Sequence, residues 1–455
     1  MSGRFHNNKM KTVLLVYLPF CTPASPPFSL TGMYSFLKAN HQGEVNVLDL
    51  NLEFHRLRFP KYQQYFQEKK KWVNYDKIVN DYFKESSKVY SDNNKLVVNG
   101  KNPELFDELL KQIIDKQPDV VAFSIVYSSQ AFYALSMLRA LKGKVKTVIG
   151  GPAINAKLSL IADKTLADEV ELLDFVNEKK IDRTKLNFGY ETKFDVYNLQ
   201  EYFTPEIVIP IKTSSSCYYK QCVFCTHHKN VKYVEYPLEI IKRNIELSKQ
   251  KYFFLIDDMI HVNRLLAFAD IVKDLNIKWT CQLRPTKEYT SEVLAKLKKA
   301  GLTMVIWGVE SGNQRILDLM KKGTRVLDVK EVLKNSHLCG IKNVTYIMFG
   351  FPTETKEEFL DTIDFLKENS EFIDLVSTSI FGLQHDTKMF NSPKLFGITN
   401  VSEEERTVLE PKISYETTSG LAKKEAMKLK DNFKKTLDNI NKYPKGMNYF
   451  REHML

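Results

Sequence analysis

The chain has 455 residues, 43% of them hydrophobic, and this length favours two or three globular domains over one. No apolar stretch reaches the roughly 18 residues that span a bilayer, so we expect no membrane segment. The net charge of +11 comes largely from scattered lysines, without a basic tail. That pattern favours solvated helix faces over a nucleic-acid-binding surface.

The first part of the chain alternates between strand-like and helix-like segments. Apolar runs predict strands at residues 11–18, 44–51, 119–126 and 145–150. Periodicity predicts helices at residues 29–39 and 131–141 and a charged, aromatic, helical insertion at 55–118. This alternation predicts a parallel sheet flanked by helices, with ligands bound beyond the carboxyl ends of the strands. Residues 153–193 are too polar and short for the usual last strand.

A second alternation begins at Ile207, after a linker at residues 194–207. Strands are predicted at residues 207–212, 252–257, 278–283, 303–308, 343–349 and 372–380. Six strands with intervening helices predict a partial barrel, in which catalytic residues lie at the strand ends. Residues 423–442 predict an amphipathic helix that packs on or caps the barrel.

Three cysteines, Cys217, Cys222 and Cys225, follow the first strand of this second alternation. Three thiolates on one loop can hold three irons of a 4Fe-4S cluster and leave the fourth iron open to a small molecule. Two alternatives stay open at this point. One is a Cys3His zinc site completed by His227 or His228, and the other is a set of unligated thiols.

The cysteine loop resembles the cluster loop of the radical S-adenosylmethionine (radical SAM) superfamily. The usual spacing has three residues between the first two cysteines, whereas four separate Cys217 from Cys222. A subgroup with an N-terminal cobalamin-binding-type domain has this longer loop, typically with glycine where this chain has Ser216. Two later segments, residues 308–323 and 346–354, resemble the fourth and fifth strand motifs of the same superfamily.

The resemblance implies an α/β fold with a doubly wound, Rossmann-like, cobalamin-binding-type domain at residues 1–193. A partial (β/α)6 radical SAM barrel follows at 194–384, and a helical C-terminal cap at 385–455. Residues 26–27 and 150–152 carry the Pro-Pro and Gly-Gly-Pro features of the first domain. The Asp-x-His-x-x-Gly signature that gives a histidine to cobalt is absent, so cobalamin binding is left open.

The resemblance also implies a set of contacts to SAM. Asp257 and Asp258 would meet the methionine ammonium, and Arg284 could pair with the methionine carboxylate. Other expected contacts come from the cysteine loop and the two strand motifs: Phe224, Glu310, Ser311 and Gly350. In this superfamily one electron from the cluster splits SAM into methionine and a 5'-deoxyadenosyl radical. We expect a flavodoxin or a ferredoxin-type protein as the electron donor.

The net reaction is predicted less sharply. We favour cobalamin-linked methyl transfer, or a related modification, on a peptide or natural-product scaffold. The rival is cobalamin-independent hydrogen abstraction of the epimerase type, for which Cys21 is the one plausibly placed thiol. Candidate acid-base groups are His227, His228 and His385. A third possibility is a nonenzymatic zinc-binding or nucleic-acid-binding module.

We expect residence in the cytoplasm, because a low-potential cluster and free thiols need reducing conditions.

Overall fold

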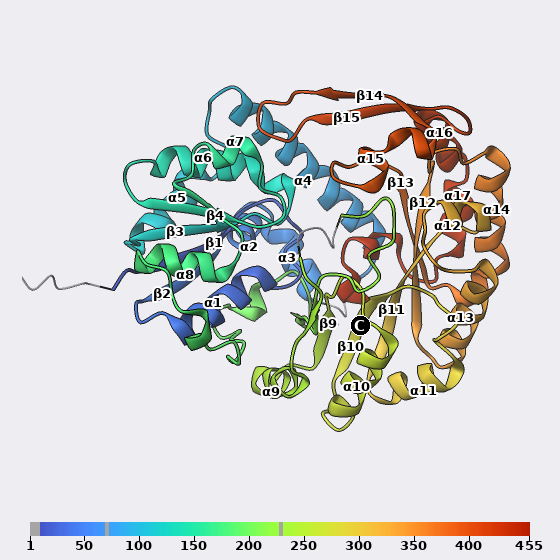
Figure 1. The fold of residues 1–455 in the computed structure, drawn as a ribbon, viewed down its shortest axis with the longest axis horizontal. Helices are drawn as coiled ribbons and strands as arrows, with labels where there is room; N and C mark the ends of the chain where they lie inside the picture. The colour runs from blue at the N-terminus through green and yellow to red at the C-terminus, as the bar shows by residue number, and fades with distance from the viewer. Residues whose placement is uncertain (1–9, 69–71, 227–230) are drawn as a thin grey trace, which may run out of the picture. The chain divides into compact units, whose positions relative to one another are not determined.

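The computed structural model describes residues 10–68, 72–226 and 231–455, which form two compact α/β units (Figure 1). The first unit extends to Ile207 and includes Arg406–Glu410. The second comprises Val208–Glu405 and Pro411–Leu455. Within the described residues, no helix combines the length and apolar character needed to cross a membrane.

The first unit contains a five-stranded sheet of order β2-β1-β3-β4-β5, in which every pairing is parallel. Its strands are β1 (Val13–Tyr17), β2 (Val45–Asp49), β3 (Val120–Ser124), β4 (Lys146–Gly150) and β5 (Lys164–Leu166). Strand β5 shows that the sequence analysis was wrong to leave residues 153–193 without a strand. The predicted doubly wound fold is otherwise confirmed.

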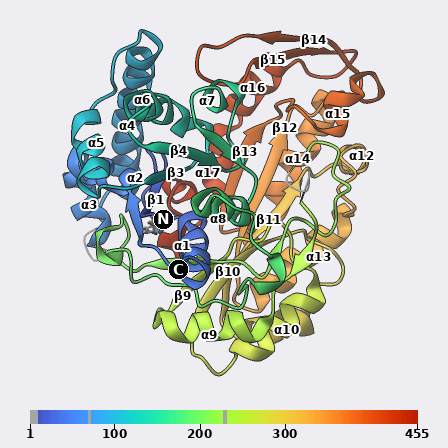
Figure 2. The same ribbon diagram turned by 60° about the vertical axis from the view of Figure 1, so that its left-hand side comes forward.

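Helices cover both faces of this sheet (Figure 2). On β1 the alternate residues Val13, Leu15 and Tyr17 pack with apolar side chains of α1 (Phe28–Asn40) and α8 (Glu169–Asn177). The remaining helices are α2 (Leu50–Arg58), α3 (Pro60–Gln67), α4 (Tyr75–Val98), α5 (Phe106–Asp115), α6 (Ala131–Leu141) and α7 (Ala156–Ser159). Helices α2 to α5 account for the predicted helical insertion.

The strand order of the first sheet reverses between β1 and β3, and such a reversal is where doubly wound sheets bind their ligands. At the carboxyl end of β3, the Ser124 hydroxyl lies 2.8 Å from the hydroxyl of Ser29 on α1. On the neighbouring strand, Gly151 follows β4 with φ of 120°, and a Cβ at this position would overlap the backbone oxygen of Ile125. Glycine is therefore required at this turn.

The second unit contains six parallel strands in chain order, β6-β9-β10-β11-β12-β13, as predicted for a partial barrel. They are β6 (Val208–Ile211), β9 (Tyr252–Leu255), β10 (Lys278–Leu283), β11 (Leu302–Glu310), β12 (Lys342–Phe349) and β13 (Leu375–Ile380). The connecting helices are α9 (Leu238–Ser248), α10 (Val262–Val272), α11 (Ser291–Lys299), α12 (Gln314–Leu319), α13 (Val326–Leu338) and α14 (Lys356–Glu368).

Several of these helices form an outer layer along one side of the sheet, among them α10, α11, α13 and α14 (Figure 1). Asn343 on β12 faces this layer and is fully buried. Its amide donates to the backbone oxygens of Leu333 and Phe372 and accepts a bond from the Trp307 indole, at 2.9, 2.7 and 2.8 Å. Tyr346, three residues on, therefore faces the opposite side of β12, the barrel interior.

The C-terminal region contains two helices, α16 (Lys423–Asn432) and α17 (Lys434–Ile440), where one helix was predicted over residues 423–442, and also a short helix α15 (Lys388–Asn391). An antiparallel hairpin of β14 (Ile398–Glu404) and β15 (Lys412–Thr417) precedes α16 and was not anticipated. Residues 441–455 then follow the edge strand β13. Asn441 and Asn448 bond the two backbone groups of Val376, at 2.8 and 3.0 Å, which satisfies part of an otherwise open edge.

The requirement for glycine at position 151 is testable with two substitutions in the same unit. Gly143 also has positive φ, of 75°, but a Cβ there would meet no atom within 4 Å. We expect Gly143→Ala to cost about 1 kcal/mol of unfolding free energy, from backbone strain alone. Gly151→Ala should cost roughly 3 kcal/mol or more, because steric overlap adds to that strain. Urea unfolding of both variants measures the difference, and equal losses would refute the steric argument.

Candidate active site

The cysteine loop leaves the carboxyl end of β6 and is fastened at its start by a buried carboxylate. Asp257, just after β9, accepts hydrogen bonds from the backbone N–H and the hydroxyl of Thr213 and of Ser214, at 2.6–3.1 Å. Burial raises the pKa of the Asp257 carboxyl, and these donors oppose the rise. Cys217 then forms a parallel bridge with Met259, two residues beyond Asp257.

Asp257 thus holds the cysteine loop against β9. Its carboxylate is engaged in these bonds, so the predicted contact with a methionine ammonium stays a prediction, as does that of its partly buried neighbour Asp258.

The three cysteines of the loop are partly buried thiols without disulfide partners. Burial raises the pKa of the Cys222 thiol, and the nearby Lys322 cation opposes that rise. No group of three or more His, Cys, Asp or Glu side chains among the described residues forms a ready metal site. The ligand role of Cys217, Cys222 and Cys225 therefore rests on the sequence. His227 and His228 lie outside the described residues.

Arg284, at the carboxyl end of β10, is 8% exposed and stacks on the ring of Tyr219 in the cysteine loop, with 3.6 Å between the guanidinium carbon and the ring centroid. Its Nη1 donates to the backbone oxygen of Lys322 at 3.1 Å. Its Nε is buried and has no hydrogen-bond partner among the described residues. A buried guanidinium with an unused donor fits the predicted pairing with a carboxylate.

Glu310 ends β11 in the left-handed region, with φ of 66°, and pairs with Lys322 at 2.7 Å. Both side chains are buried, with 12% and 7% of their surfaces exposed. A site role is predicted from the sequence for Glu310 but not for Lys322. The lysine follows a second lysine in a charged stretch, and only its spatial position beside Glu310 and Cys222 distinguishes it from a solvated side chain.

Ser311, 1% exposed, points away from this pair. Its hydroxyl lies 3.1 Å from that of Thr362 on α14, which also accepts the N–H of Gly312 at 3.0 Å. Ser311 therefore attaches the turn after β11 to the outer layer. Its predicted contact with SAM stays a prediction.

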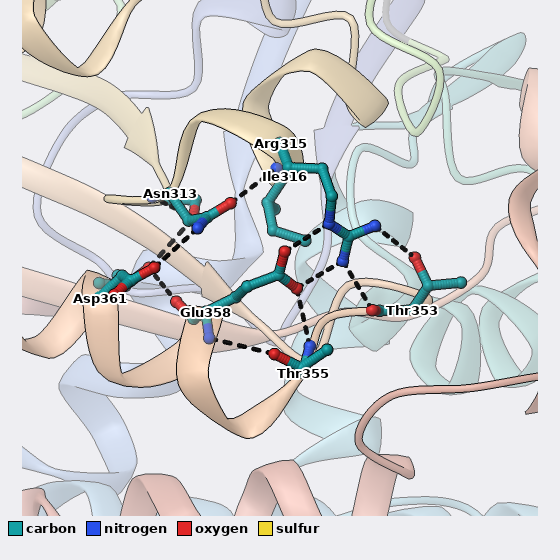
Figure 3. A network of polar contacts seen from close by, with 9 residues as sticks. Asn313, Arg315, Ile316, Thr353, Thr355, Glu358 and Asp361 are labelled. Atoms are coloured by element: carbon teal, nitrogen blue, oxygen red, sulfur yellow. Dashed lines mark hydrogen bonds and ion pairs between the residues drawn. The ribbon is translucent and has the colours of Figure 1, made fainter.

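A polar network next to this turn joins α12 to α14 (Figure 3). Arg315 forms a two-pronged ion pair with Glu358 and donates to the backbone oxygen of Thr353 at 2.8 Å. Asn313 donates to Asp361 at 2.8 Å. The network fixes the loop after β12 against the helix that follows β11.

Gly350, at the end of β12, has φ of 70°, and its N–H donates to Glu354 at 2.6 Å. A Cβ at this glycine would lie 2.8 Å from that of Ala426 on α16, so this position requires the glycine for space as well as for backbone conformation. Glu354 is fully buried, and its second oxygen has no hydrogen-bond partner among the described residues. Burial raises the pKa of Glu354 to about 7.

The other predicted residues are less central. Phe224 packs on an apolar cluster that includes Val223 and Met320. His385 lies 4.6 Å from the ring of Phe390, measured between centroids, and 3.6 Å from the carboxylate of Glu403. Nothing in these contacts assigns His385 an acid-base role.

Cys21 belongs to the first unit. Its sulfur lies 3.5 Å from the Tyr17 hydroxyl, and burial raises the pKa of the thiol to about 12.

Comparison with known proteins agrees with this geometry. Residues 211–366 match the radical SAM superfamily profile. An uncharacterized methyltransferase of Pyrococcus horikoshii is 23% identical over 332 residues, which is 62% of this chain and 72% of the relative. The bacteriochlorophyllide d C-12(1)-methyltransferase of Chlorobaculum tepidum is 29% identical over 174 residues, 36% of this chain and 38% of that enzyme.

Two solved structures share the fold over most of the chain. The cobalamin-dependent SAM radical enzyme OxsB gives a TM-score of 0.63 at 14% identity, covering 94% of this chain and 67% of OxsB. The radical SAM methyltransferase TsrM from Kitasatospora setae gives 0.59 at 15% identity, covering 88% and 80%. Residues 211–366 therefore form a radical SAM domain, so the chain is an enzyme that carries this domain, and the two solved structures share the fold around it.

Ser216 provides a test of the cysteine loop's conformation. It has φ of 59°, and its buried hydroxyl has no hydrogen-bond partner among the described residues. We expect Ser216→Gly to stabilise the apoprotein by about 1 kcal/mol, because it removes backbone strain and an unsatisfied hydroxyl. Ser215→Gly is the control and should destabilise, since the Ser215 hydroxyl bonds both Lys232 and Val234. Anaerobic urea unfolding measures the unfolding free energy of both variants. A lower unfolding free energy for Ser216→Gly than for wild type would contradict the prediction that Ser216 strains the loop.

The raised pKa of Glu354 makes stability depend on pH. Between pH 4.5 and 7 the unfolded state loses the proton while the folded state keeps it, so stability falls as pH rises. We expect wild type to lose roughly 3 kcal/mol relative to Glu354→Gln from pH 4.5 to pH 8, because the amide resembles the neutral acid. Unfolding curves at several pH values measure this difference. If the unfolding free energies of the two proteins changed with pH in the same way, the Glu354 carboxyl would already be ionised in the folded state.

Proposed function

We propose that this enzyme binds a 4Fe-4S cluster through Cys217, Cys222 and Cys225 and couples reductive cleavage of SAM to cobalamin-linked methyl transfer. The observation that carries this proposal is the cysteine loop itself, held by Asp257 at the carboxyl edge of a six-stranded parallel partial barrel. When bound, such a cluster supplies the electron that cleaves the sulfonium.

The protein's own charges suit a zwitterionic nucleotide. Arg284 offers a buried and unused Nε–H to a carboxylate. Because the site around it is buried, this charge-assisted bond is stronger than it would be in water. Glu310 and Lys322 neutralise one another at 2.7 Å, so neither leaves an uncompensated charge beside the substrate.

Cobalamin is proposed for the carboxyl edge of β1 and β3 in the first unit. The strand reversal supports a ligand there, and two structural neighbours are named as a cobalamin-dependent SAM radical enzyme and a radical SAM methyltransferase with cobalamin bound. Histidine ligation of cobalt is not supported by the described part of this unit. His55 is fully enclosed with its Nδ1 on Asn51, and His41 bonds Lys11.

The substrate is proposed to be a peptide or a small natural-product molecule, with a flavodoxin or ferredoxin-type donor and a reducing, cytoplasmic setting. Names of relatives support methyl transfer, since they include methyltransferases and a ribosomal-protein methylthiotransferase.

Hydrogen abstraction without cobalamin is the second candidate. Its supporting observation is that Cys21 lies beyond the carboxyl end of β1, at the edge where doubly wound sheets bind ligands, with its sulfur 3.5 Å from the Tyr17 hydroxyl. Burial raises the pKa of this thiol, so the S–H bond is intact at neutral pH. An intact S–H is what a thiol needs in order to return a hydrogen atom to a substrate radical. If Cys21→Ala abolished deuterium incorporation from solvent while SAM cleavage continued, this candidate would replace methyl transfer.

The proposed function predicts two products. After anaerobic reconstitution with iron, sulfide and hydroxocobalamin, we expect dithionite-reduced enzyme with labelled SAM to release both 5'-deoxyadenosine and S-adenosylhomocysteine. We expect a variant with all three loop cysteines changed to alanine to release neither, because it lacks the ligands for the cluster. Chromatography of the labelled products measures this.

Each other outcome is informative. 5'-Deoxyadenosine alone indicates hydrogen abstraction. A colourless wild-type protein that holds one zinc and leaves SAM intact would overturn radical chemistry altogether.

A further inference from the structure

Three consecutive backbone oxygens in the turn after α12 accept hydrogen bonds from the cysteine loop and from β10. The backbone oxygen of Met320 accepts the N–H of Val223 at 3.1 Å, and that of Lys321 accepts the Tyr219 hydroxyl at 2.9 Å. The oxygen of Lys322 accepts Arg284, as described above. The last carbonyls of a helix lack partners within the helix, so this turn presents acceptors in a row. We call residues 320–323 the loop seat.

Tyr219 is the residue of the cysteine loop whose side chain bonds the loop seat. Its hydroxyl binds the seat while its ring lies against the Arg284 guanidinium, so one residue joins the loop to both α12 and β10. The next residue, Lys220, turns the chain with φ of 53°. We propose that Tyr219 is the positioning residue of the cluster loop, which holds Cys217 and Cys222 in the geometry that the cluster requires.

The four-residue spacing between Cys217 and Cys222 explains why the loop needs a positioning residue. The loop is fixed before Cys217 by Asp257 and after Cys222 by the bond from Val223 to the seat. Four residues between the cysteines leave the backbone more freedom than three, and contacts within that stretch restrict it. Tyr218 packs there on His261, and Tyr219 makes the hydrogen bond to the loop seat.

The space that Tyr219 occupies against the loop seat depends on the glycine at position 323. Gly323 has φ of 68°, and a Cβ there would overlap the Tyr219 hydroxyl and lie 3.1 Å from Nη1 of Arg284. The same turn sends Lys322 inward to Glu310, beside Cys222. The position of the loop thereby also sets how close this cation lies to a cluster ligand.

This inference rests on the proposed cluster and is tested through iron retention and spectroscopy rather than turnover. Wild type, Tyr219→Phe and Tyr219→Leu are reconstituted anaerobically, and iron loss to a chelator is timed. Tyr219→Leu should release iron roughly tenfold faster than wild type, as expected when a residue that supports metal ligands is lost. Tyr219→Phe keeps the ring on Arg284 and should fall between the two. The reduced cluster of Tyr219→Leu should also give a broadened or mixed EPR signal.

Gly323→Ala provides a second route that leaves the tyrosine in place, with Gly340→Ala as its matched control. Both glycines have positive φ, of 68° and 71°, but a Cβ at Gly340 meets only the end of the Lys298 side chain at 3.8 Å. Gly323→Ala should accelerate iron loss while Gly340→Ala should not, although both strain the backbone. Adding Tyr219→Phe to Gly323→Ala removes the overlapping hydroxyl and should restore part of the retention.

The outcomes distinguish a failure of the proposed function from a failure of the role of Tyr219. A wild-type protein that takes up no iron would refute the proposed function. A wild-type protein that holds its cluster, with Tyr219→Leu and Gly323→Ala releasing iron and giving EPR signals as wild type does, would overturn the role of Tyr219 alone. Should Tyr219→Leu fail to fold, as judged by circular dichroism, the comparison between Gly323→Ala and Gly340→Ala decides.

Discussion

The buried carboxylate of Asp257 is the contact on which the site depends. Because β6 and β9 are neighbouring parallel strands, their carboxyl ends meet at one edge, and Asp257 there binds both backbone N–H groups that start the cysteine loop. Four donors compensate the cost of burying this charge. Without Asp257 the N–H groups of Thr213 and Ser214 would lose their hydrogen-bond acceptor, and the loop would lose its fixed origin.

Positive charge gathers around the loop that this carboxylate fixes. Arg284 and Lys322 approach it from β10 and from the turn after α12, and only Lys322 has a buried carboxylate partner, Glu310. Three thiolates and a carboxylate-bearing nucleotide would bring negative charge to the same place. The arrangement would therefore suit the proposed cluster and nucleotide, and the buried Nε of Arg284 has no partner among the described residues.

Sequence predicted the strands of both sheets and the cysteine loop because those signals are local. A run of apolar residues or a cysteine spacing is visible within a dozen positions. The three-residue strand β5 escaped because two of its residues, Lys164 and Thr165, are exposed. The hairpin of β14 and β15 escaped because its apolar residues are too few to form a run. Ile398, Val401, Ile413 and Tyr415 pack on a neighbouring apolar cluster, and most of the other positions are polar.

The missed site residues share a different cause. Tyr219, Lys322 and Gly323 acquire meaning only when the cysteine loop meets a turn about a hundred residues later in the chain. Asp257 was predicted to lie at the site, but its bonds to the loop depend on the pairing of β6 with β9. Pattern within one segment carries no information on which backbone oxygen a tyrosine will reach.

Three carboxylates near strand ends, Asp257, Asp49 and Glu354, differ in the number of hydrogen bonds that they accept. Asp257 accepts four donors. Asp49, the last residue of β2, accepts the N–H of Leu52 and the Tyr202 hydroxyl, and burial raises its pKa to about 6. Glu354 accepts Gly350, and its pKa reaches about 7. Each donor favours the charged form, so the four donors at Asp257 oppose the rise in pKa that burial causes there. Of these three carboxylates, the one that accepts the most donors is thus the one that anchors the cysteine loop.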